Sequence, residues 1–499
     1  MKGKMHGNRG SMAADDIRAE ILNPFVHNVE LDTTFDKIKT AIFTVVLLPF
    51  RVMVICYLLV TAWFLACIGL YGLSEEDLRS RPMTGWRRKL PVCALMRAIF
   101  YTGGFDIRTT GTQTTQAEAA VLCVAPHSSF FDALVLGFAR VPSVVCKAEA
   151  ATLPFFGKLI NYTQPVYVWR DDPNSRQNTI REIIERATSP DWPQILIFPE
   201  GTCTNRSCLI TFKPGGFYPG VPVQPVTIRY PNHLDTVTWT WEGPSALKLL
   251  WLTLTRVHSA CEIEFLPVYY PSEAETKDPK LYASNVRNVM AKALGIPVSD
   301  YTYDDCRLLC RAKQLNIPHA TSLVEAQTNR KALGLDVIRK ECSLLDKGGR
   351  WAGTAGAGDP GVDLRQFCER LGVSEGDPAS QALFNVFVEK STGEVDWRDY
   401  LMSAAFLSLP GAQTSEILSY AFKIYDDSGV GRLSQDDVII ALSRCAALAH
   451  EEGSAAFQQV DMDARGWITA EEFFKFAEKK AEFAFLFHSE DVISKVKTQ

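Results

Sequence analysis

The sequence predicts a chain of three parts: an N-terminal membrane helix or hairpin, an α/β domain with a mixed sheet and flanking helices, and an all-α C-terminal domain. Three observations lead to this prediction. An uncharged apolar stretch runs from Val52 to Leu73. Short β-rich runs alternate with helix-compatible stretches between Ala119 and Pro271, a pattern typical of α/β domains. Beyond residue 300, helical segments are separated by glycine-containing turns that recur every roughly 30–40 residues, a spacing that indicates a repeat.

The composition is that of a globular protein in a reducing compartment. The chain has 499 residues, of which 47% are hydrophobic and 22% are charged. This length exceeds one ordinary domain, so about two or three folded units are expected. The net charge of −5 gives no overall basic field, and we expect no nucleic-acid partner. The 13 cysteines include no C-x-x-C pair, which favours free thiols over a disulfide framework.

The N-terminal part divides into a polar tail, residues 1–40, and an apolar segment, residues 41–73. The uncharged portion of this segment is long enough to cross a bilayer. Pro49 and Arg51 interrupt the apolar run, so the segment is either one spanning helix or a kinked re-entrant hairpin. A buried core helix is the remaining alternative. The membrane-proximal linker that follows, residues 74–118, is rich in arginine, and the positive-inside rule places it and everything after it in the cytosol.

The α/β domain is expected over residues 119–300. Its predicted strands are the β-rich runs at 120–125, 143–147, 166–170, 195–199, 221–230 and 263–270. Ligands of α/β sheets bind at the carboxyl ends of the strands. The residues that directly follow these runs are therefore the candidates for chemistry.

The first predicted strand is followed by the sequence PHSSFFD, in which His127 precedes Asp132 by five residues. Ser128 and Ser129 are good N-caps for a following helix. Two residues five apart on a regular helix would point about 140° apart. We therefore expect His127 in the strand–helix loop and Asp132 in the first turn, where its carboxylate accepts from one imidazole nitrogen and leaves the other free. The chain has no G-x-S-x-G elbow, so the nucleophile is expected to be a hydroxyl group of the substrate.

A second polar cluster follows the strand ILIFP and runs from Glu200 to Arg206. A turn glycine beside an acid and an arginine offers backbone N–H groups and a fixed charge for phosphate. An ordinary strand-ending loop with an ion pair is the alternative. Arg170, at the end of the strand VYVWR, and Arg176 could each bind phosphate or form a surface salt bridge.

The order of these blocks resembles the glycerophospholipid acyltransferase family. HSSFFD, VYVWR, FPEGTCTNR and VPVQPV follow one another like the four acyltransferase blocks of that family. The longer string FPEGTCTNRSCLITFKPGGF, with TVTWTWEG downstream, is similar to the lysophosphatidylcholine acyltransferases that carry C-terminal EF-hands. That group includes an enzyme that acetylates lyso-platelet-activating factor. The resemblance covers nearly the whole chain.

The resemblance implies a role for each matching residue. His127 would be the general base toward the sn-2 hydroxyl of a lysophospholipid, and Asp132 would orient it. The phosphate region of the lysophospholipid would be held by residues of the second and third blocks: Arg170, Glu200, Gly201, Thr202 and Arg206. The acyl-CoA side would be lined by residues of the fourth block: Pro222, Val223 and Pro225. Acyl-CoA would be a co-substrate, and catalysis would need no cofactor.

The C-terminal part, residues 301–499, is expected to be a degenerate EF-hand domain with EF-like units in pairs. An EF-hand loop needs oxygen ligands at positions 1, 3, 5 and 12, and Gly at position 6. The best match is DMDARGWITAEE, whose candidate calcium ligands are Asp461, Asp463, the backbone carbonyl of Trp467, and Glu472. Arg465 stands at position 5 and opposes calcium, while the loops at 388–399 and 426–437 are more eroded. Weak calcium binding by one loop and a packed scaffold without calcium both remain open.

The leading functional hypothesis is an enzyme that reacylates the sn-2 hydroxyl of lysophosphatidylcholine, with acetylation of lyso-platelet-activating factor as a further activity. Acylation of lysophosphatidic acid or glycerol-3-phosphate is one alternative, and an inactive membrane-tethered EF-hand adaptor is another. The expected partners are the lysophospholipid, acyl-CoA and the lipid bilayer. The terminal sequence KVKTQ resembles a dilysine retrieval signal, which indicates the endoplasmic reticulum membrane, with the Golgi or a lipid droplet as alternatives.

Overall fold

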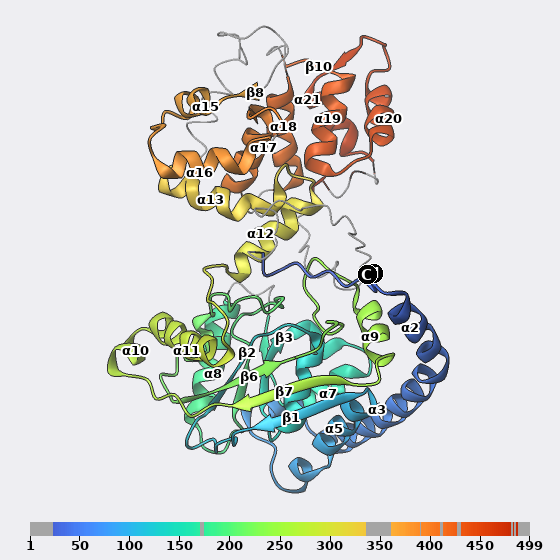
Figure 1. Cartoon of the computed structure of the whole chain (residues 1–499), viewed down its shortest axis with the longest axis vertical. Helices are drawn as coiled ribbons and strands as arrows, with labels where there is room; N and C mark the ends of the chain where they lie inside the picture. The colour runs from blue at the N-terminus through green and yellow to red at the C-terminus, as the bar shows by residue number, and fades with distance from the viewer. Residues whose placement is uncertain are drawn as a thin grey trace, which may run out of the picture. The chain divides into compact units, whose positions relative to one another are not determined.

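A computed structural model describes most of the chain and divides it into two compact units, Met1–Tyr303 and Asp304–Gln499 (Figure 1). The residues that it describes are 23–169, 174–335, 361–389, 391–409, 413–426, 431–480, 483 and 486–487.

The first unit is built on a seven-stranded sheet in the order β1-β7-β6-β2-β5-β3-β4 (Figure 1). The strands are β1 (Phe105–Thr110), β2 (Val121–Ala125), β3 (Ser143–Lys147), β4 (Val166–Val168), β5 (Ile195–Ile197), β6 (Val223–Arg229) and β7 (Ser259–Phe265). β6 and β7 are antiparallel and all other neighbours are parallel, so the predicted mixed sheet is confirmed. β1 lies in the stretch that the sequence assigned to the membrane-proximal linker, so part of that stretch belongs to the sheet.

Helices cover both faces of the sheet. Besides the N-terminal apolar helices, this unit contains α4 (Glu75–Ser80), α5 (Val92–Thr102), α6 (Leu134–Phe138), α7 (Phe156–Tyr162), α8 (Ser175–Thr188), α9 (Ala246–Leu254), α10 (Glu273–Lys277) and α11 (Pro279–Leu294). The central strand β2 is wholly buried, and its alternate side chains point into two cores. Cys123 packs in a core with residues of α8 and α11, and Leu122 packs in a core with residues of α6. This burial fixes β2 and therefore the loop that leaves its carboxyl end.

The N-terminal apolar segment forms the helices α2 (Thr34–Val46) and α3 (Leu48–Leu70). Leu47, between them, keeps right-handed helical angles of φ −92° and ψ −42°, and α3 continues the path of α2 without reversing (Figure 1). Pro49 lies in the first turn of α3, where a missing N–H costs no hydrogen bond. The structure therefore has two helices that follow one another end to end over this segment. The spanning helix and the re-entrant hairpin both stay predictions.

Arg51 does not break this helix because its side chain points into the protein. Its guanidinium donates to the backbone carbonyls of Leu254, Arg256 and Val257, at 2.8, 2.5 and 2.9 Å. The rest of α3 is largely exposed, since 17% of its most apolar 18-residue stretch is buried inside the protein. Within the described part of the chain, α3 is the one helix long and apolar enough to cross a membrane, judged by length and composition.

In its described residues, the second unit consists of helices and two short antiparallel strand pairs. Its helices are α12 (Tyr303–Gln314), α13 (Leu323–Ala332), α15 (Leu364–Leu371), α16 (Pro378–Phe387), α17 (Trp397–Ser408), α18 (Thr414–Tyr425), α19 (Gln435–Ala446), α20 (His450–Val460) and α21 (Ala470–Ala477). β8 (Gly361–Val362) pairs with β9 (Val395–Asp396), and β10 (Leu433–Ser434) pairs with β11 (Trp467–Ile468). β9, β10 and β11 each lie between two helices along the chain, and β8 precedes α15. The strand pairing therefore joins these helix–strand–helix segments in pairs.

Candidate active site

Three loops converge at one edge of the sheet. β5 and β6 flank β2 and run parallel to it, so the carboxyl ends of all three strands lie together. His127 follows β2, Glu200 follows β5, and Tyr230 directly follows β6. The second and third loops therefore meet the first where the sequence predicted chemistry.

His127 and Asp132 form a hydrogen-bonded pair. Asp132 lies in a 3₁₀ turn, Phe130–Ala133, which Ser129 caps by accepting from the backbone N–H of Phe131. One imidazole nitrogen, Nδ1 of His127, lies 2.8 Å from Oδ2 of Asp132. The expected arrangement, with the histidine in the loop and the carboxylate in the first turn, is confirmed.

The Asp132 carboxylate is fully buried and its position is determined by further donors. Oδ2 accepts from the backbone N–H groups of Ser128 and Ser129 at 2.7 and 2.9 Å. Oδ1 accepts from the Tyr230 hydroxyl at 2.7 Å. Burial keeps the pKa of Tyr230 well above its usual range, so the hydroxyl remains a donor. A buried carboxylate held by four donors can orient the imidazole and stabilise its protonated form.

The second nitrogen of His127, Nε2, lies 3.6 Å from the Cys203 sulfur. The imidazole ring also stacks on Phe198, with ring centroids 4.3 Å apart. Burial opposes protonation of the imidazole, but Cys203 and Asp132 outweigh burial and raise the pKa of His127. The His127 side chain keeps 23% of its surface exposed, so a substrate can reach the ring.

Glu200 supports the histidine loop from inside the protein. It is fully buried, and its Oε2 accepts from the backbone N–H of His127 at 2.6 Å. Burial raises the pKa of Glu200 to about 7, against the opposing effect of that hydrogen bond. A buried carboxylate that faces a backbone N–H offers nothing to a phosphate anion. The structure therefore places Glu200 as a support for His127.

The neighbours of Glu200 complete this loop. Gly201 has φ +68°, and a Cβ on it would lie 2.9 Å from the Lys213 side chain, so glycine fits both the backbone and the space. Thr202 is buried, and the backbone N–H of Thr204 donates to the His127 carbonyl at 2.8 Å. The loop after β5 is thus hydrogen-bonded to both the backbone N–H and the backbone carbonyl of His127.

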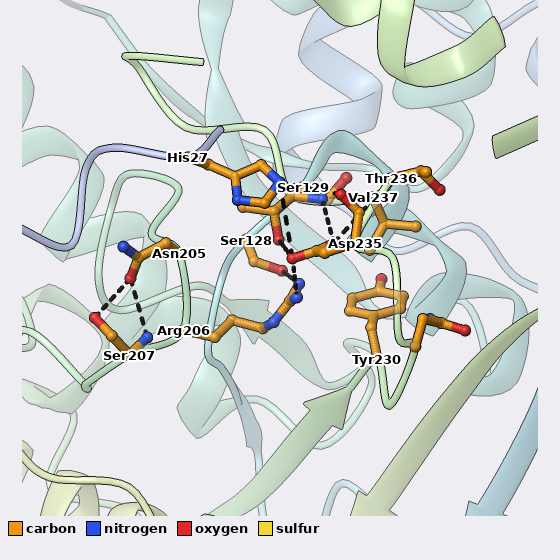
Figure 2. A network of polar contacts seen from close by, with 12 residues as sticks. His27, Ser128, Ser129, Asn205, Arg206, Ser207, Tyr230, Asp235, Thr236 and Val237 are labelled. Carbon is orange, nitrogen blue, oxygen red and sulfur yellow. Dashed lines mark hydrogen bonds and ion pairs between the residues drawn. The ribbon is translucent and has the colours of Figure 1, made fainter. Parts of the chain in front are cut away.

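Arg206 reaches the same loops from the far end of this segment, and Figure 2 shows its guanidinium between Ser128 and Asp235. One nitrogen donates to Oγ of Ser128 at 3.0 Å and the other pairs with Asp235 at 2.5 Å. The guanidinium carbon lies 5.3 Å from the centre of the Tyr230 ring. Arg206 is therefore a fixed cation beside the His127 loop.

The remaining predicted substrate residues lie elsewhere. Pro225 and Val223 are buried in β6, and Pro222, just before the strand, is partly exposed. Arg176 is exposed in the first turn of α8 and lines a shallow groove. Arg170 lies outside the described residues. The sheet thus brings together His127, Asp132 and the loop from Glu200 to Arg206.

In the predicted calcium loop, the Arg465 side chain pairs with two of the candidate calcium ligands. Asp461 accepts from the backbone N–H groups of Arg465 and Gly466 at 2.9 and 2.8 Å. The Arg465 guanidinium pairs with Glu472 at 2.9 Å and with Asp461 at 3.6 Å. Asp463 is exposed. No group of three or more His, Cys, Asp or Glu side chains in the described ranges could hold a metal ion.

Three features of the site were not predicted. Tyr230 could have been found, because it is the last residue of a predicted strand, the end at which chemistry was expected. The contact of Cys203 with His127 and the pairing of Asp235 with Arg206 have no local sequence signal, since each joins residues far apart in the chain.

Several known proteins are similar to this chain. Residues 106–229 match the Acyltransferase family. A lysophosphatidylcholine acyltransferase of Drosophila melanogaster is 42% identical over 95% of this chain and 89% of its own length. The human lysophosphatidylcholine acyltransferases 1 and 2 are each 42% identical over 93% of this chain, which covers 86% and 84% of those proteins. The solved structure of a 1-acyl-sn-glycerophosphate acyltransferase, PlsC, from Thermotoga maritima covers 53% of this chain and 100% of its own, with 21% identity and a TM-score of 0.36.

Proposed function

Because the chain belongs to the lysophosphatidylcholine acyltransferase family, we propose that it transfers an acyl group from acyl-CoA to the sn-2 hydroxyl of lysophosphatidylcholine. Acyl transfer itself follows from family membership. The observation that carries the proposal for the site is the His127–Asp132 pair at the meeting point of three strand ends. Acetylation of lyso-platelet-activating factor is proposed as a further activity of the same site.

In the proposed reaction, Nε2 of His127 takes the proton of the sn-2 hydroxyl while its oxygen attacks the thioester carbonyl carbon. A C–O ester bond forms and the C–S bond breaks. The imidazolium then gives the proton to the departing coenzyme A sulfur. Asp132, hydrogen-bonded to Nδ1, stabilises the charge that His127 carries between these two steps.

The raised pKa of His127 sets the expected pH dependence. A base with a raised pKa accepts a proton more strongly, but it must be neutral before it can act. The neutral fraction grows as the pH rises toward that pKa, so activity should increase from neutral to alkaline pH. The acidic limb of the profile is therefore assigned to His127.

The phosphate of the lysophospholipid is proposed to bind beside Arg206. Arg206 is a fixed cation, and two of its donors are already directed at Ser128 and Asp235. A guanidinium has five N–H donors, so others remain for a phosphate oxygen. Gly201 and Thr202 are proposed to shape this end, and Pro222 and Pro225 the acyl-CoA side. Arg170 stays a proposal on its sequence position.

The proposal is tested with the purified full chain in vesicles, assayed against a panel of lysophospholipids, glycerol-3-phosphate and acyl-CoA donors that include acetyl-CoA. Lysophosphatidylcholine should be the preferred acceptor, and His127→Ala should abolish transfer. The matched control is His258→Ala, at an exposed histidine after α9. Activity retained in His127→Ala would contradict the mechanism, and preference for lysophosphatidic acid would contradict the head group.

The surroundings of the site are proposed as well. We propose that α3 lies in the endoplasmic reticulum membrane and that the active site is cytosolic. Support comes from the apolar, largely exposed surface of α3. Asn161 and Asn205 stand in N-x-S/T sequences and should carry no glycan in that orientation. A glycosidase-sensitive mobility shift would overturn it.

We propose that the second unit is a degenerate EF-hand domain. Its helix–strand–helix units are joined in pairs by β8 with β9 and by β10 with β11. The backbone contacts of Asp461 resemble those of the first ligand residue in an EF-hand loop. Any calcium at the candidate ligands would have to displace Arg465, so binding should be too weak to detect at millimolar calcium.

A further inference from the structure

The segment Asn23–His27, which precedes the membrane helix, lies against the two loops that hold Arg206; we call it the strap. The sequence assigned it to a polar tail. In the structure Phe25 is 2% exposed and packs edge-on against Tyr301, with ring centroids 5.7 Å apart. A buried aromatic side chain fixes the strap to the first unit.

On one side the strap binds the loop after β5 through Asn205, the residue before Arg206. The backbone N–H of Asn205 donates to the Pro24 carbonyl at 2.7 Å. Its side-chain amide donates to the carbonyls of Asn23 and Val26 at 3.1 and 3.0 Å. Both donors of the amide nitrogen are therefore used on the strap, and the amide oxygen accepts from Ser207.

On the other side the strap binds the loop after β6, which carries Asp235. The backbone N–H of His27 donates to the Glu242 carbonyl at 2.8 Å, and the Glu242 N–H donates to the Phe25 carbonyl at 3.1 Å. Nε2 of His27 lies 3.1 Å from the Asp235 carbonyl oxygen and 3.9 Å from its carboxylate (Figure 2). The strap thus spans from the neighbour of Arg206 to the ion-pair partner of Arg206.

Arg206 depends on both loops for its position. Its backbone has φ +66°, a left-handed conformation that a non-glycine residue adopts only when its surroundings hold it there. Burial raises the pKa of the Asp235 carboxyl, but Arg206 together with Thr238 and His27 outweighs burial and lowers that pKa, which keeps the pair charged. A shift of either loop would move the guanidinium away from Ser128 and from the place proposed for the phosphate.

We infer that the strap is part of the acceptor site: Asn205 and His27 are positioning residues that hold Arg206 where it binds the phosphate of the lysophospholipid. This inference rests on the proposed function, because it assigns Arg206 to the phosphate. It predicts that disturbing the strap weakens acceptor binding while the reaction with acyl-CoA keeps its own KM.

The test is Asn205→Asp in the full chain. The substitution keeps the shape of the side chain but replaces the NH₂ group, which donates to the carbonyls of Asn23 and Val26, with a carboxylate oxygen that can only accept. The KM for lysophosphatidylcholine should rise by roughly tenfold, the effect of weakening one charge-assisted hydrogen bond. The KM for acyl-CoA should change by less than about twofold, because the inference assigns the strap to the acceptor and not to acyl-CoA. Loss of folded enzyme alone would lower the rate and alter neither KM. The matched control is Asn316→Asp, which removes an amide-to-carbonyl hydrogen bond within the second unit and should leave both constants unchanged.

A double-mutant cycle separates positioning from general support. In the Arg206→Ala background, Asn205→Asp should have no further effect on the acceptor KM, because the residue that it positions is gone. Additive effects, or an unchanged acceptor KM in Asn205→Asp, would overturn the inference. If Asn205→Asp does not fold, the milder His27→Ala enters the same cycle and is judged by the same criteria. If Arg206→Ala itself leaves the acceptor KM unchanged, the phosphate assignment in the proposed function fails, which is a different outcome from failure of the strap alone.

Discussion

Both units pair a basic side chain with acidic ones, but they do so in different ways. In the first unit Asp132 faces the imidazole of His127, and the second nitrogen of that ring lies at a partly exposed site. In the second unit Asp461 and Glu472 face the permanent charge of Arg465. A histidine can gain and lose a proton in the course of a reaction, whereas an arginine keeps its proton. The comparison therefore separates a site arranged for proton transfer from a loop whose charges are already neutralised.

The largest effect that tests this comparison is expected for Asp132→Asn. The amide keeps the shape of the carboxylate but cannot stabilise the imidazolium, and it can turn its N–H₂ toward Nδ1 and favour the wrong tautomer. Transfer should fall by about a thousandfold or more, with little change in either KM. Turnover is measured at saturating lysophosphatidylcholine and acyl-CoA, and Asp463→Asn in the exposed part of the second unit is the control. A loss of less than about tenfold would mean that the pair does not act as a unit.

The Tyr230→Phe variant sharpens the account of Asp132 through the pH profile. Removing the hydroxyl leaves Oδ1 of Asp132 without its donor and leaves more negative charge to face the imidazolium. The pKa of His127 should rise further, so the acidic limb of kcat should move to higher pH, and turnover at neutral pH should fall by roughly tenfold. A lower rate with an unmoved limb would assign Tyr230 to packing alone.

Much of the first site could be predicted because its information is local. His127 and Asp132 are five residues apart, after a buried strand and around a capping serine, so their contact follows from backbone geometry. The edge strand β1 was missed because one of its six residues is buried, which leaves little periodic signal. Arg51 was interpreted as an interruption, since sequence does not show that its side chain points inward to three backbone carbonyls.

The strap and the calcium loop contain contacts that could not be predicted from the sequence. The strap contacts Asn205 through backbone carbonyls from a part of the chain more than 170 residues earlier. Every residue has a backbone carbonyl, so the sequence does not show which ones make such a contact. Arg465 was recognised as opposing calcium at its position, but its pairing with Glu472, seven residues later, depends on how the loop closes. Local spacing identifies which residues can meet, and tertiary contacts decide what they meet.

A smaller effect is expected for Cys203→Ala, which tests whether the thiol at Nε2 takes part in the chemistry. The thiol helps to raise the pKa of His127, so its removal should lower that pKa and move the acidic limb of kcat to lower pH, opposite to Tyr230→Phe. Turnover at alkaline pH should stay within about threefold of the unmodified protein, because the hydroxyl attacks the thioester directly. Cys146→Ala, at a half-buried cysteine in β3, is the control. A loss comparable to that of Asp132→Asn would instead indicate an acyl-cysteine intermediate.

The smallest effect on activity is expected for Arg465→Asn, which changes the loop of the second unit and leaves the His127 site unchanged. The substitution removes the cation between Asp461 and Glu472 and supplies a side-chain oxygen at the fifth loop position, as an EF-hand loop requires. Titration calorimetry with calcium should give no heat for the unmodified protein at millimolar calcium and a measurable heat for the variant, with a Kd of about 10⁻⁴–10⁻³ M, the range of the weakest EF-hand modules. Turnover without calcium should be the same for both. Strong calcium binding by the unmodified protein would show that Arg465 leaves its carboxylates readily, and the contrast with His127 would then be one of degree.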